Sequence, residues 1–280
     1  MNALNREEIT LTIVEKLEKH KDQLSQDFKN KRKNIPFFVV DDLLPANWCK
    51  EINEAFPDTS LMVLKKSIRE HKFVGVQMDL YEQLIGEVTY AFQDKRVVDL
   101  IGEICGIDSC YADASLYAGG ISTMVENQFL KPHLDNSHDQ QREKWRVLNL
   151  LYYTTPDWET SFGGNLEVWP NGLKKEPTTI TSRFNRLVVM GTDSNSWHAV
   201  SKVVTNKHRN CVSNYYFSET PLSSDDSFHV TLFRGWSKQK WDDMLLRLDG
   251  IARMGIRKIF KKGIVKNPHV YKKKEENSND

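Results

Sequence analysis

The sequence predicts an α+β protein in which a β-rich core of jelly-roll or sandwich type lies between helical flanks. Between about residue 115 and residue 217, short β-rich runs alternate with Gly, Pro, Asn or Asp. The residues on either side of this region show helical periodicity instead. With 280 residues, of which 39% are hydrophobic and 10% aromatic, the chain is long enough to bury a large core.

The amino-terminal part is expected to be mostly helical. Residues 1–34 form a predicted amphipathic leader helix, whose apolar residues at helical spacing are Ile9, Ile13, Leu17, Leu24 and Phe28. A buried strand over 36–40 leads into a helix that Pro57 ends. Residues 80–105 carry two apolar stripes, separated by Asp94 and closed by Gly106, and these predict two helices.

Six strands are predicted in the β-rich region. They are Ile121–Val125, Trp145–Tyr153, Leu166–Trp169, Arg186–Met190, His198–Val204 and Arg209–Phe217. Helical periodicity returns after Phe228, with Trp241, Leu245, Leu248, Ile251, Ile256 and Ile259. We therefore expect a folded domain over 35–218 with its core at about 115–218. A basic helical extension would follow over 219–280 and end in a disordered tail.

Composition excludes several classes of protein. Lys and Arg number 39 against 38 Asp and Glu, so no overall field favours a nucleic-acid partner. The four cysteines (Cys49, Cys105, Cys110 and Cys211) are too scattered for a disulfide framework and are expected to be reduced thiols. Neither a secretory signal nor a membrane-spanning run is apparent. These features predict a cytoplasmic protein.

A candidate metal site comes from three residues of the β-rich region. His133 and Asp135 form an H-x-D motif in a stretch that reads as a loop, and His198 opens a later strand. Two histidines and one carboxylate make the facial triad that holds non-haem Fe(II). A structural zinc site is an alternative, although such a site normally closes with a fourth protein ligand.

Arg209 adds a candidate binding site for a small carboxylate. It starts the strand after His198, so a short hairpin could return its guanidinium to the metal site. The planar guanidinium suits bidentate contact with a carboxylate. An Fe(II) triad with a carboxylate anchor is what a 2-oxoglutarate co-substrate requires.

An ordered set of motifs now points to a family. The motifs are FFVVDDLLPANWCKEI, PHLDN, LNLLYYTTPDW, GGNLEVW, NRLVVM, WHAV and RNCVSNYYF. Over about residues 35–218 the chain resembles the Fe(II)/2-oxoglutarate-dependent dioxygenases, in their prolyl 4-hydroxylase-like branch. This resemblance implies a double-stranded β-helix, the cupin-like jelly roll. It also implies that His133, Asp135 and His198 ligate iron, and that Arg209 and Tyr153 bind the distal carboxylate of 2-oxoglutarate.

The resemblance further implies an activity. The enzyme would use O₂ and 2-oxoglutarate to hydroxylate an unactivated C–H bond, releasing succinate and CO₂, with ascorbate as a candidate reductant. No catalytic residue beyond the metal ligands, and no substrate-binding residue, is identified. The substrate would be a small molecule, a glycan or a peptidyl residue. A catalytically silent glycan-binding jelly roll, and a surface glycan or lipid-linked sugar as substrate, are alternatives.

Some residues depart from the family pattern or carry weaker hypotheses. Cys211 stands where many relatives have a hydroxyl, and Thr123 or Met124 replaces a tyrosine near the co-substrate. Residues 57–80 and 136–144 are candidate lids. The basic residues 251–274 predict a solvated helix and tail, or alternatively a peripheral contact with an anionic membrane or glycolipid at the inner membrane face.

Two further local features carry structural interpretations. The pair Gly163-Gly164 is typical of a tight turn with positive φ. His208, next to Arg209, is expected to point to the opposite face of its strand and to be exposed to solvent.

Overall fold

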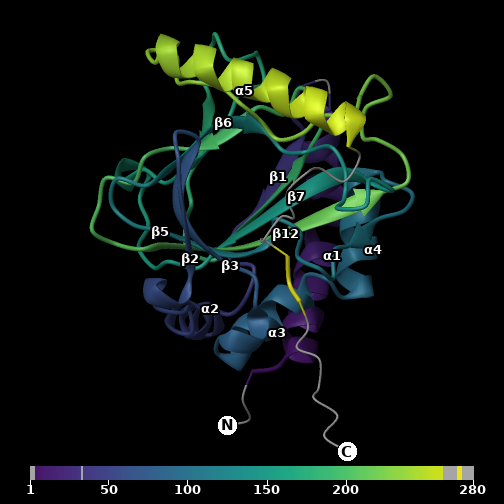
Figure 1. The fold of residues 1–280 in the computed structure, drawn as a ribbon. Helices are drawn as coiled ribbons and strands as arrows, with labels where there is room; N and C mark the ends of the chain where they lie inside the picture. The colour runs from purple at the N-terminus through teal and green to yellow at the C-terminus, as the bar shows by residue number, and fades with distance from the viewer. Residues whose placement is uncertain (1–3, 33, 261–269, 273–280) are drawn as a thin grey trace, which may run out of the picture.

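A curled antiparallel sheet with helices on its outside dominates the computed structural model, which describes residues 4–32, 34–260 and 270–272 (Figure 1). Its long path runs β1-β10-β7-β12-β5-β3-β6-β11-β8-β9, with β2, β4 and β13 paired at the side. The strands are β1 (Phe37–Val40), β2 (Val63–Lys66), β3 (Glu70–Gly75), β4 (Tyr111–Ala112), β5 (Gly120–Met124), β6 (Phe129–Leu134), β7 (Trp145–Tyr153), β8 (Leu166–Val168), β9 (Thr178–Ile180), β10 (Arg186–Gly191), β11 (His198–Val200), β12 (Arg209–Ser218) and β13 (Leu232–Phe233). This is the predicted jelly-roll core.

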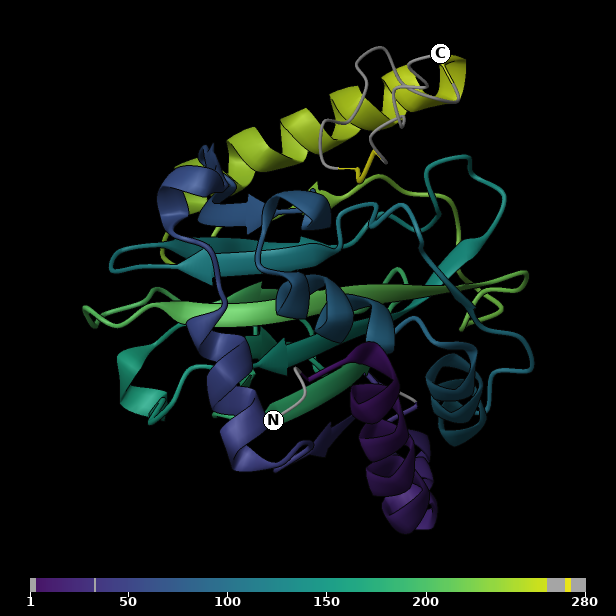
Figure 2. The same ribbon diagram turned by 90° about the horizontal axis from the view of Figure 1, so that it is seen from below.

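Five α-helices flank the sheet in the described part of the chain. They are α1 (Arg6–Asn30), α2 (Ala46–Glu54), α3 (Gln83–Ala91), α4 (Lys95–Cys105) and α5 (Lys240–Ile259). Short 3-10 turns over Thr59–Leu61, Met78–Leu80 and Thr160–Phe162 join the other elements. Seen from below, α1 and α5 lie on different sides of the sheet (Figure 2).

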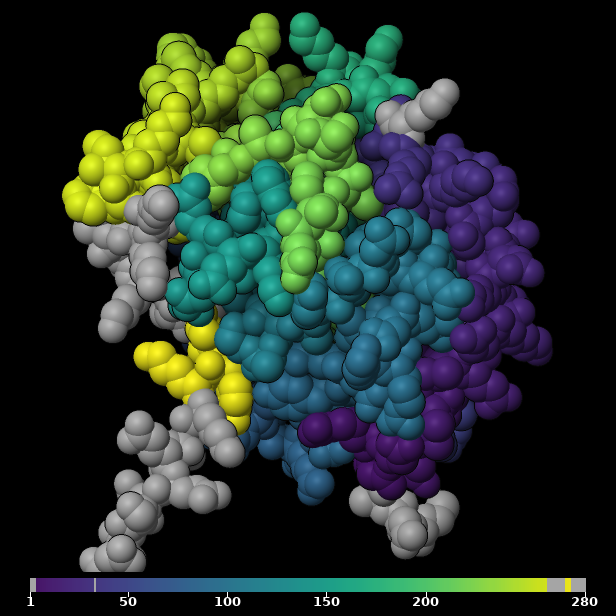
Figure 3. Space-filling model, turned by 90° about the vertical axis from the view of Figure 1, so that its right-hand side faces the viewer, coloured from purple at the N-terminus to yellow at the C-terminus, as the bar shows by residue number. Residues whose placement is uncertain are grey.

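Helix α1 is fixed at its start and along its length. The side chains of Asn5 and Glu8 each accept a hydrogen bond from the other residue's backbone N–H, which is a capping box. All five apolar residues predicted for its inner face are buried. The helix packs along α4 and α3, and Figure 3 shows the amino-terminal segment next to these helices on one surface of the molecule. α1 shares one apolar cluster with the sheet. The division at residue 34 between a leader helix and the following domain stays a prediction.

The predicted start and end of α4 are confirmed. Asp94 caps α4 by accepting a hydrogen bond from the Arg96 N–H. Gly106 ends the helix with φ +65°, a left-handed conformation that glycine adopts without strain.

The long strand β7 separates two environments. Leu150 and Tyr152 face the helices and belong to the main apolar cluster. Asn149 and Leu151 point the other way and line the inside of the curled sheet. This alternation, which follows from the period of two in a strand, places polar side chains inside the barrel.

The predicted strands of the β-rich region are present, while one other prediction there is wrong. His133 and Leu134 are the last residues of β6, not part of a loop. Residues 57–80, a candidate lid, contain β2 and β3, and β3 pairs with both β5 and β6; the lid itself stays a prediction. β6 could not be predicted from the sequence because Pro132 lies inside it. Proline is tolerated there because the pairing with β11 shifts register between Leu130 and His133.

The carboxyl-terminal helix forms where it was predicted, but its apolar residues are exposed. Trp241, Leu248 and Ile251 of α5 all lie on the protein surface. The predicted disordered tail lies outside the described residues, apart from 270–272. In the described ranges, no helix combines the length and the apolar character of a bilayer-crossing segment.

Candidate metal centre and co-substrate cavity

The three candidate metal ligands come from adjacent strands of the curled sheet. His133 ends β6, Asp135 follows one residue later, and His198 begins β11. His133 and His198 are direct partners in the pairing of β6 with β11, and their ring centroids are 4.1 Å apart. The sheet therefore brings together residues that are 65 positions apart in the sequence.

Backbone carbonyls orient both imidazole rings. The His133 Nδ1 lies 2.9 Å from the Lys131 carbonyl oxygen, and the His198 Nδ1 lies 2.8 Å from the Ser196 carbonyl oxygen. Because a carbonyl only accepts hydrogen bonds, each Nδ1 must donate its proton. Each neutral ring is then left with a lone pair on Nε2.

Both of these lone pairs point at the same carboxylate. The Nε2 atoms of His133 and His198 lie 3.6 Å from Oδ1 and Oδ2 of Asp135, respectively. All three ligand atoms lie within 4.8 Å of one another, and all three side chains are buried. Two lone pairs that face a carboxylate repel it unless a cation lies between them. The donor set therefore fits a divalent metal such as Fe(II).

Burial and neighbouring charges keep His198 and Asp135 in the protonation states that bind a metal. Burial, together with the neighbouring His133, lowers the pKa of His198 to about 4, so this ring is neutral at neutral pH. Burial alone would raise the pKa of Asp135. Its polar and cationic neighbours, Arg146 among them, outweigh that effect and hold the pKa well below its usual range.

Side chains around the cluster hold the carboxylate in place. The Asn149 amide donates a hydrogen bond of 3.2 Å to Asp135 Oδ2, and Arg146 Nη1 lies 3.9 Å from Oδ1. The Phe233 ring stacks on the His133 ring at 5.3 Å between centroids, with 18° between the planes. Such supporting contacts orient metal ligands and limit the access of water.

Arg209 lies in the same cavity as the three candidate ligands, which has a volume of about 290 Å³. It is buried, and its Nε donates a hydrogen bond of 3.1 Å to Ser182 Oγ. Within the described residues, no carboxylate pairs with this guanidinium. A buried cation that faces a cavity without a protein anion is suited to a carboxylate ligand.

The other residues predicted near the co-substrate differ in their placement. The Tyr153 ring lies 4.8 Å from the Arg209 guanidinium, and its buried hydroxyl has no hydrogen-bond partner in the described structure. Burial raises the pKa of Tyr153 to about 12, so the hydroxyl keeps its proton and can donate it. Cys211 and Met124 line the cavity, whereas Thr123 donates a hydrogen bond to Asn210 instead.

The Gly163-Gly164 turn lies behind Arg209, and both residues have the expected positive φ, +67° and +62°. The Gly164 carbonyl accepts a hydrogen bond from Ser182 Oγ, the same hydroxyl that Arg209 contacts. A Cβ at Gly164 would lie 3.0 Å from Arg209 Cδ. The turn therefore packs closely against the arginine side chain. His208 is exposed, as predicted.

Sequence reasoning missed Arg146, the most deeply buried charged side chain near the metal centre. Its guanidinium packs against the Tyr215 ring at 3.9 Å. Strict alternation along β7 would place Arg146 on the outer face, opposite to Asn149. The pairing with β12 shifts register at this point, because Phe217 lies opposite Arg146 while Tyr216 lies opposite Leu148. The extra residue turns Arg146 inward, and no sequence signal marked it.

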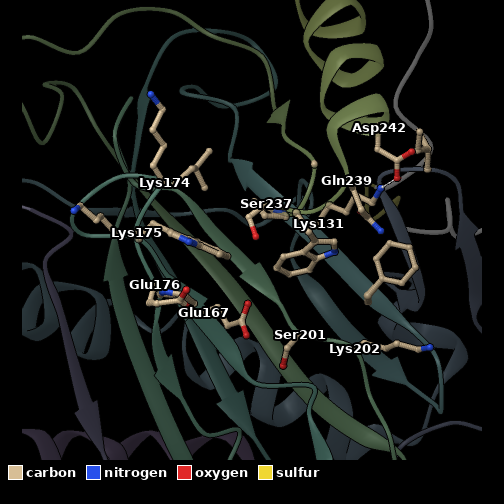
Figure 4. A pocket seen from close by; sticks show the side chains of 18 of the residues that line it. Lys131, Glu167, Lys174, Lys175, Glu176, Ser201, Lys202, Ser237, Gln239 and Asp242 are labelled. Atoms are coloured by element: carbon tan, nitrogen blue, oxygen red, sulfur yellow. Dashed lines mark hydrogen bonds and ion pairs between the residues drawn. The ribbon is translucent and has the colours of Figure 1, made fainter.

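Another cavity, of about 780 Å³, lies on the opposite face of the same strands (Figure 4). It is lined by Glu167 of β8 and Lys131 of β6, whereas Leu166 and Leu130 line the metal cavity. Lys131 forms an ion pair with Asp242 of α5. Burial, and then the neighbouring Glu176, raise the pKa of Glu167. This cavity contains none of the three candidate metal ligands.

Residues 119–217 match the family model of the 2OG-Fe(II) oxygenase superfamily. The matched segment contains His133, Asp135, His198 and Arg209. The predicted resemblance is thus confirmed at the level of the superfamily. No curated protein matches this chain by sequence.

Solved structures extend the likeness of this chain beyond the matched segment. A prolyl hydroxylase from Trichoplax adhaerens, in complex with a hypoxia inducible factor peptide fragment, has a TM-score of 0.53 at 17% identity, over 72% of this chain and 92% of that one. A prolyl-4-hydroxylase from Pseudomonas putida has a TM-score of 0.52 at 14% identity, over 70% and 100%. A prolyl 4-hydroxylase from Phytophthora capsici has 0.51 at 16%, over 91% and 80%. At these identities the comparisons show the shared fold.

Proposed function

We propose that the protein is an Fe(II)- and 2-oxoglutarate-dependent dioxygenase that hydroxylates an unactivated C–H bond of its substrate and releases succinate and CO₂. The observation that carries this proposal is the convergence of two Nε2 lone pairs on the Asp135 carboxylate. A catalytically silent glycan-binding module would have no use for this buried donor set, because burying a carboxylate between two rings is costly without a metal.

The candidate ligands and several of their neighbours have separate roles in this proposal. His133, Asp135 and His198 would hold Fe(II), which supplies the redox chemistry that couples decarboxylation of 2-oxoglutarate to oxidation of the substrate. Arg209 would pair with the distal carboxylate of 2-oxoglutarate, and the Tyr153 hydroxyl would donate a hydrogen bond to it. Phe233 covers His133 and excludes water from that side. Ascorbate is the candidate reductant, and activity assays of this protein would include it.

Three protein ligands distinguish this site from a structural zinc site. Among the described residues, the cluster contains only these three groups that can bind a metal. Structural zinc sites normally have four protein ligands. A site with three protein ligands leaves positions for a co-substrate on the cavity side, where Arg209 lies.

Anaerobic titration of the metal-free protein with Fe(II) and 2-oxoglutarate tests the proposal. We expect a weak visible charge-transfer band, followed by formation of succinate when air is admitted. His198→Ala should abolish both signals, and Arg209→Ala should weaken the binding of 2-oxoglutarate. His208→Ala is the matched control, because this exposed histidine precedes Arg209 without lining the metal cavity.

The outcomes separate the alternatives clearly. A band that needs His198, with succinate on aeration, supports the dioxygenase. Folded protein that gives neither signal with iron in excess contradicts it and favours the glycan-binding module, which glycan arrays would then test. Tight zinc binding that survives His198→Ala would also contradict the assignment of the ligands.

The cavity favours a substrate with an acidic group. Besides Arg209, it is lined by the cations Lys65, Arg69, Lys72 and Arg146. The anions that line it are fewer, namely Asp135 and Glu70, and Glu70 pairs with Lys72 at 3.3 Å. An excess of cations in a cleft attracts anions. Small-molecule, peptidyl and glycan substrates all stay within the proposal. Screening for succinate release should find acidic compounds more active than their neutral analogues, and equal activity would contradict this preference.

A further inference from the structure

We propose that the outward face of α5 binds the surface of an anionic lipid bilayer. This inference goes beyond the proposed function and does not depend on it, because it rests on a helix outside the metal cavity. Figures 1 and 2 both show α5 at the edge of the molecule, away from α1.

The apolar residues of α5 form one stripe that faces away from the protein. Trp241, Ile251 and Ile259 are 77%, 70% and 77% exposed, and Met244, Leu245 and Leu248 are exposed as well. Their spacing of three and four residues places them on one side of a helix with 3.6 residues per turn. From Trp241 to Ile259 the stripe is roughly 27 Å long at about 1.5 Å per residue. Soluble proteins rarely expose an apolar patch of this extent.

The opposite side of α5 attaches the helix to the protein, and this side is largely polar. Only Leu246 and Gly250 are buried. Asp242 pairs with Lys131, Asp243 with Arg234 at 2.6 Å, and Asp249 with Arg69. A helix on the surface of a soluble protein normally buries its apolar stripe and exposes its charges. The ion pairs hold α5 with its acidic side toward the protein and its apolar side toward solvent, so the apolar side is free to contact a lipid surface.

The charges around the apolar stripe of α5 favour an anionic surface as its binding partner. The three acidic residues of α5 all have cationic partners on the protein side. Lys240, Arg247 and Lys258 lie along one edge of the apolar stripe and are exposed. The sequence from Gly250 to Lys274 then contains nine Lys and Arg and no acidic residue. An exposed apolar stripe bordered by cations is typical of helices that lie in the interface of anionic membranes.

Co-sedimentation of the full-length protein with vesicles tests the inference. We expect binding to vesicles of phosphatidylcholine mixed with phosphatidylglycerol, weaker binding to phosphatidylcholine alone, and a loss of binding as salt is raised. The double variant Leu248→Glu/Ile251→Glu should reduce partitioning to the anionic vesicles by about tenfold or more. Leu61→Glu/Leu64→Glu is the matched control, because both leucines are exposed far from α5 along the chain.

The same variants identify the competing occupants of this face. Wild-type protein that sediments with neither vesicle overturns the inference, and so does a double variant that binds as well as wild type. A dimer that Leu248→Glu/Ile251→Glu converts to monomer, without vesicle binding, would assign the stripe to a second copy of the chain. Circular dichroism and thermal unfolding check that the variants are folded. Both substituted side chains are exposed, so neither measurement should change.

Discussion

At the scale of single residues, the metal centre depends on the groups that converge on the Asp135 carboxylate. Both oxygens of this carboxylate face an imidazole Nε2 at 3.6 Å. Asn149 donates to one of them, and the Arg146 guanidinium lies beyond the other. The Asn149 hydrogen bond and the nearby Arg146 guanidinium limit the rotation of this carboxylate, so a metal would meet it in one orientation.

The first prediction concerns Arg146. Arg146→Met should lower the affinity for Fe(II) by about 10- to 100-fold, because supporting contacts to metal ligands typically have effects of this size. Anaerobic titration measures the change. Arg186→Met is the matched control, since Arg186 is a half-buried arginine that pairs with Asp41 instead. Equal losses in both variants would show a general effect on folding rather than a contact at the metal centre.

The second prediction concerns backbone conformation at the turn behind Arg209. A Cβ at Gly163 would lie 1.9 Å from the Lys202 carbonyl oxygen, and φ is +67°. Gly163→Ala should therefore lower the free energy of unfolding by more than the roughly 1–3 kcal/mol of backbone strain alone. Gly172 also has a positive φ, +80°, but a Cβ there meets open space. Urea unfolding should show a clearly smaller loss for Gly172→Ala, and equal losses would contradict the steric argument.

Some residues of the site could be predicted from the sequence. These are residues with a metal- or carboxylate-binding side chain that also stand at the expected place in the order of motifs. His133, Asp135, His198 and Arg209 meet in one cavity. Arg146 could not be predicted in the same way, because the bulge in the pairing of β7 with β12 reverses its side. The inner or outer position of a strand residue depends on register, and a single inserted residue changes it without a sign in the local pattern.

At the scale of elements, period alone predicted the helices and the buried strands. The strands it missed are the ones with weak apolar patterns. In β2 all four residues lie at or near the surface, and in β6 Pro132 interrupts the strand. β2 is stabilised by the hairpin that it forms with β3, and β6 by β3, β11 and β13, which are distant in the sequence. A local pattern carries no information about such a partner.

The third prediction is that α1 contributes strongly to the stability of the whole fold. Leu17 is fully buried in the main apolar cluster, whereas Leu11 on the same helix is 51% exposed. Leu17→Ala should lower the free energy of unfolding by about 2–5 kcal/mol, and Leu11→Ala by much less. Chemical denaturation of both variants measures the difference. Similar small losses would mean that α1 is a separable leader rather than part of the core.

At the scale of the whole molecule, ligand binding should couple to stability. The metal ligands and Arg209 come from β6, β11 and β12 and the turn after β6, so a ligand that contacts them all links distant strands. At a concentration about 100 times the Kd, a ligand stabilises the native state by about 2.7 kcal/mol. For a protein of this size, each kcal/mol corresponds to roughly 2–4 °C in Tm.

The fourth prediction follows from this coupling. Fe(II) with 2-oxoglutarate under anaerobic conditions should raise the Tm of the wild type by several degrees, measured by differential scanning fluorimetry. His198→Ala should lose this rise, because the metal loses one of three ligands. His208→Ala should keep it. A rise that is the same in His198→Ala would show that the ligands bind elsewhere on the protein.

The pairing of β1 with β10 has a consequence for how the chain is made. Phe37 of β1 lies opposite Met190 of β10. During synthesis, β1 therefore cannot pair until the ribosome has added about 150 more residues. At about 5–20 residues per second, this wait lasts roughly 8–30 s. During that time the apolar faces of α1 and β1 have no sheet to cover them. Sheets with such high contact order fold slowly. Slower synthesis at low temperature, or a chaperone bound to the nascent chain, should therefore raise the soluble yield.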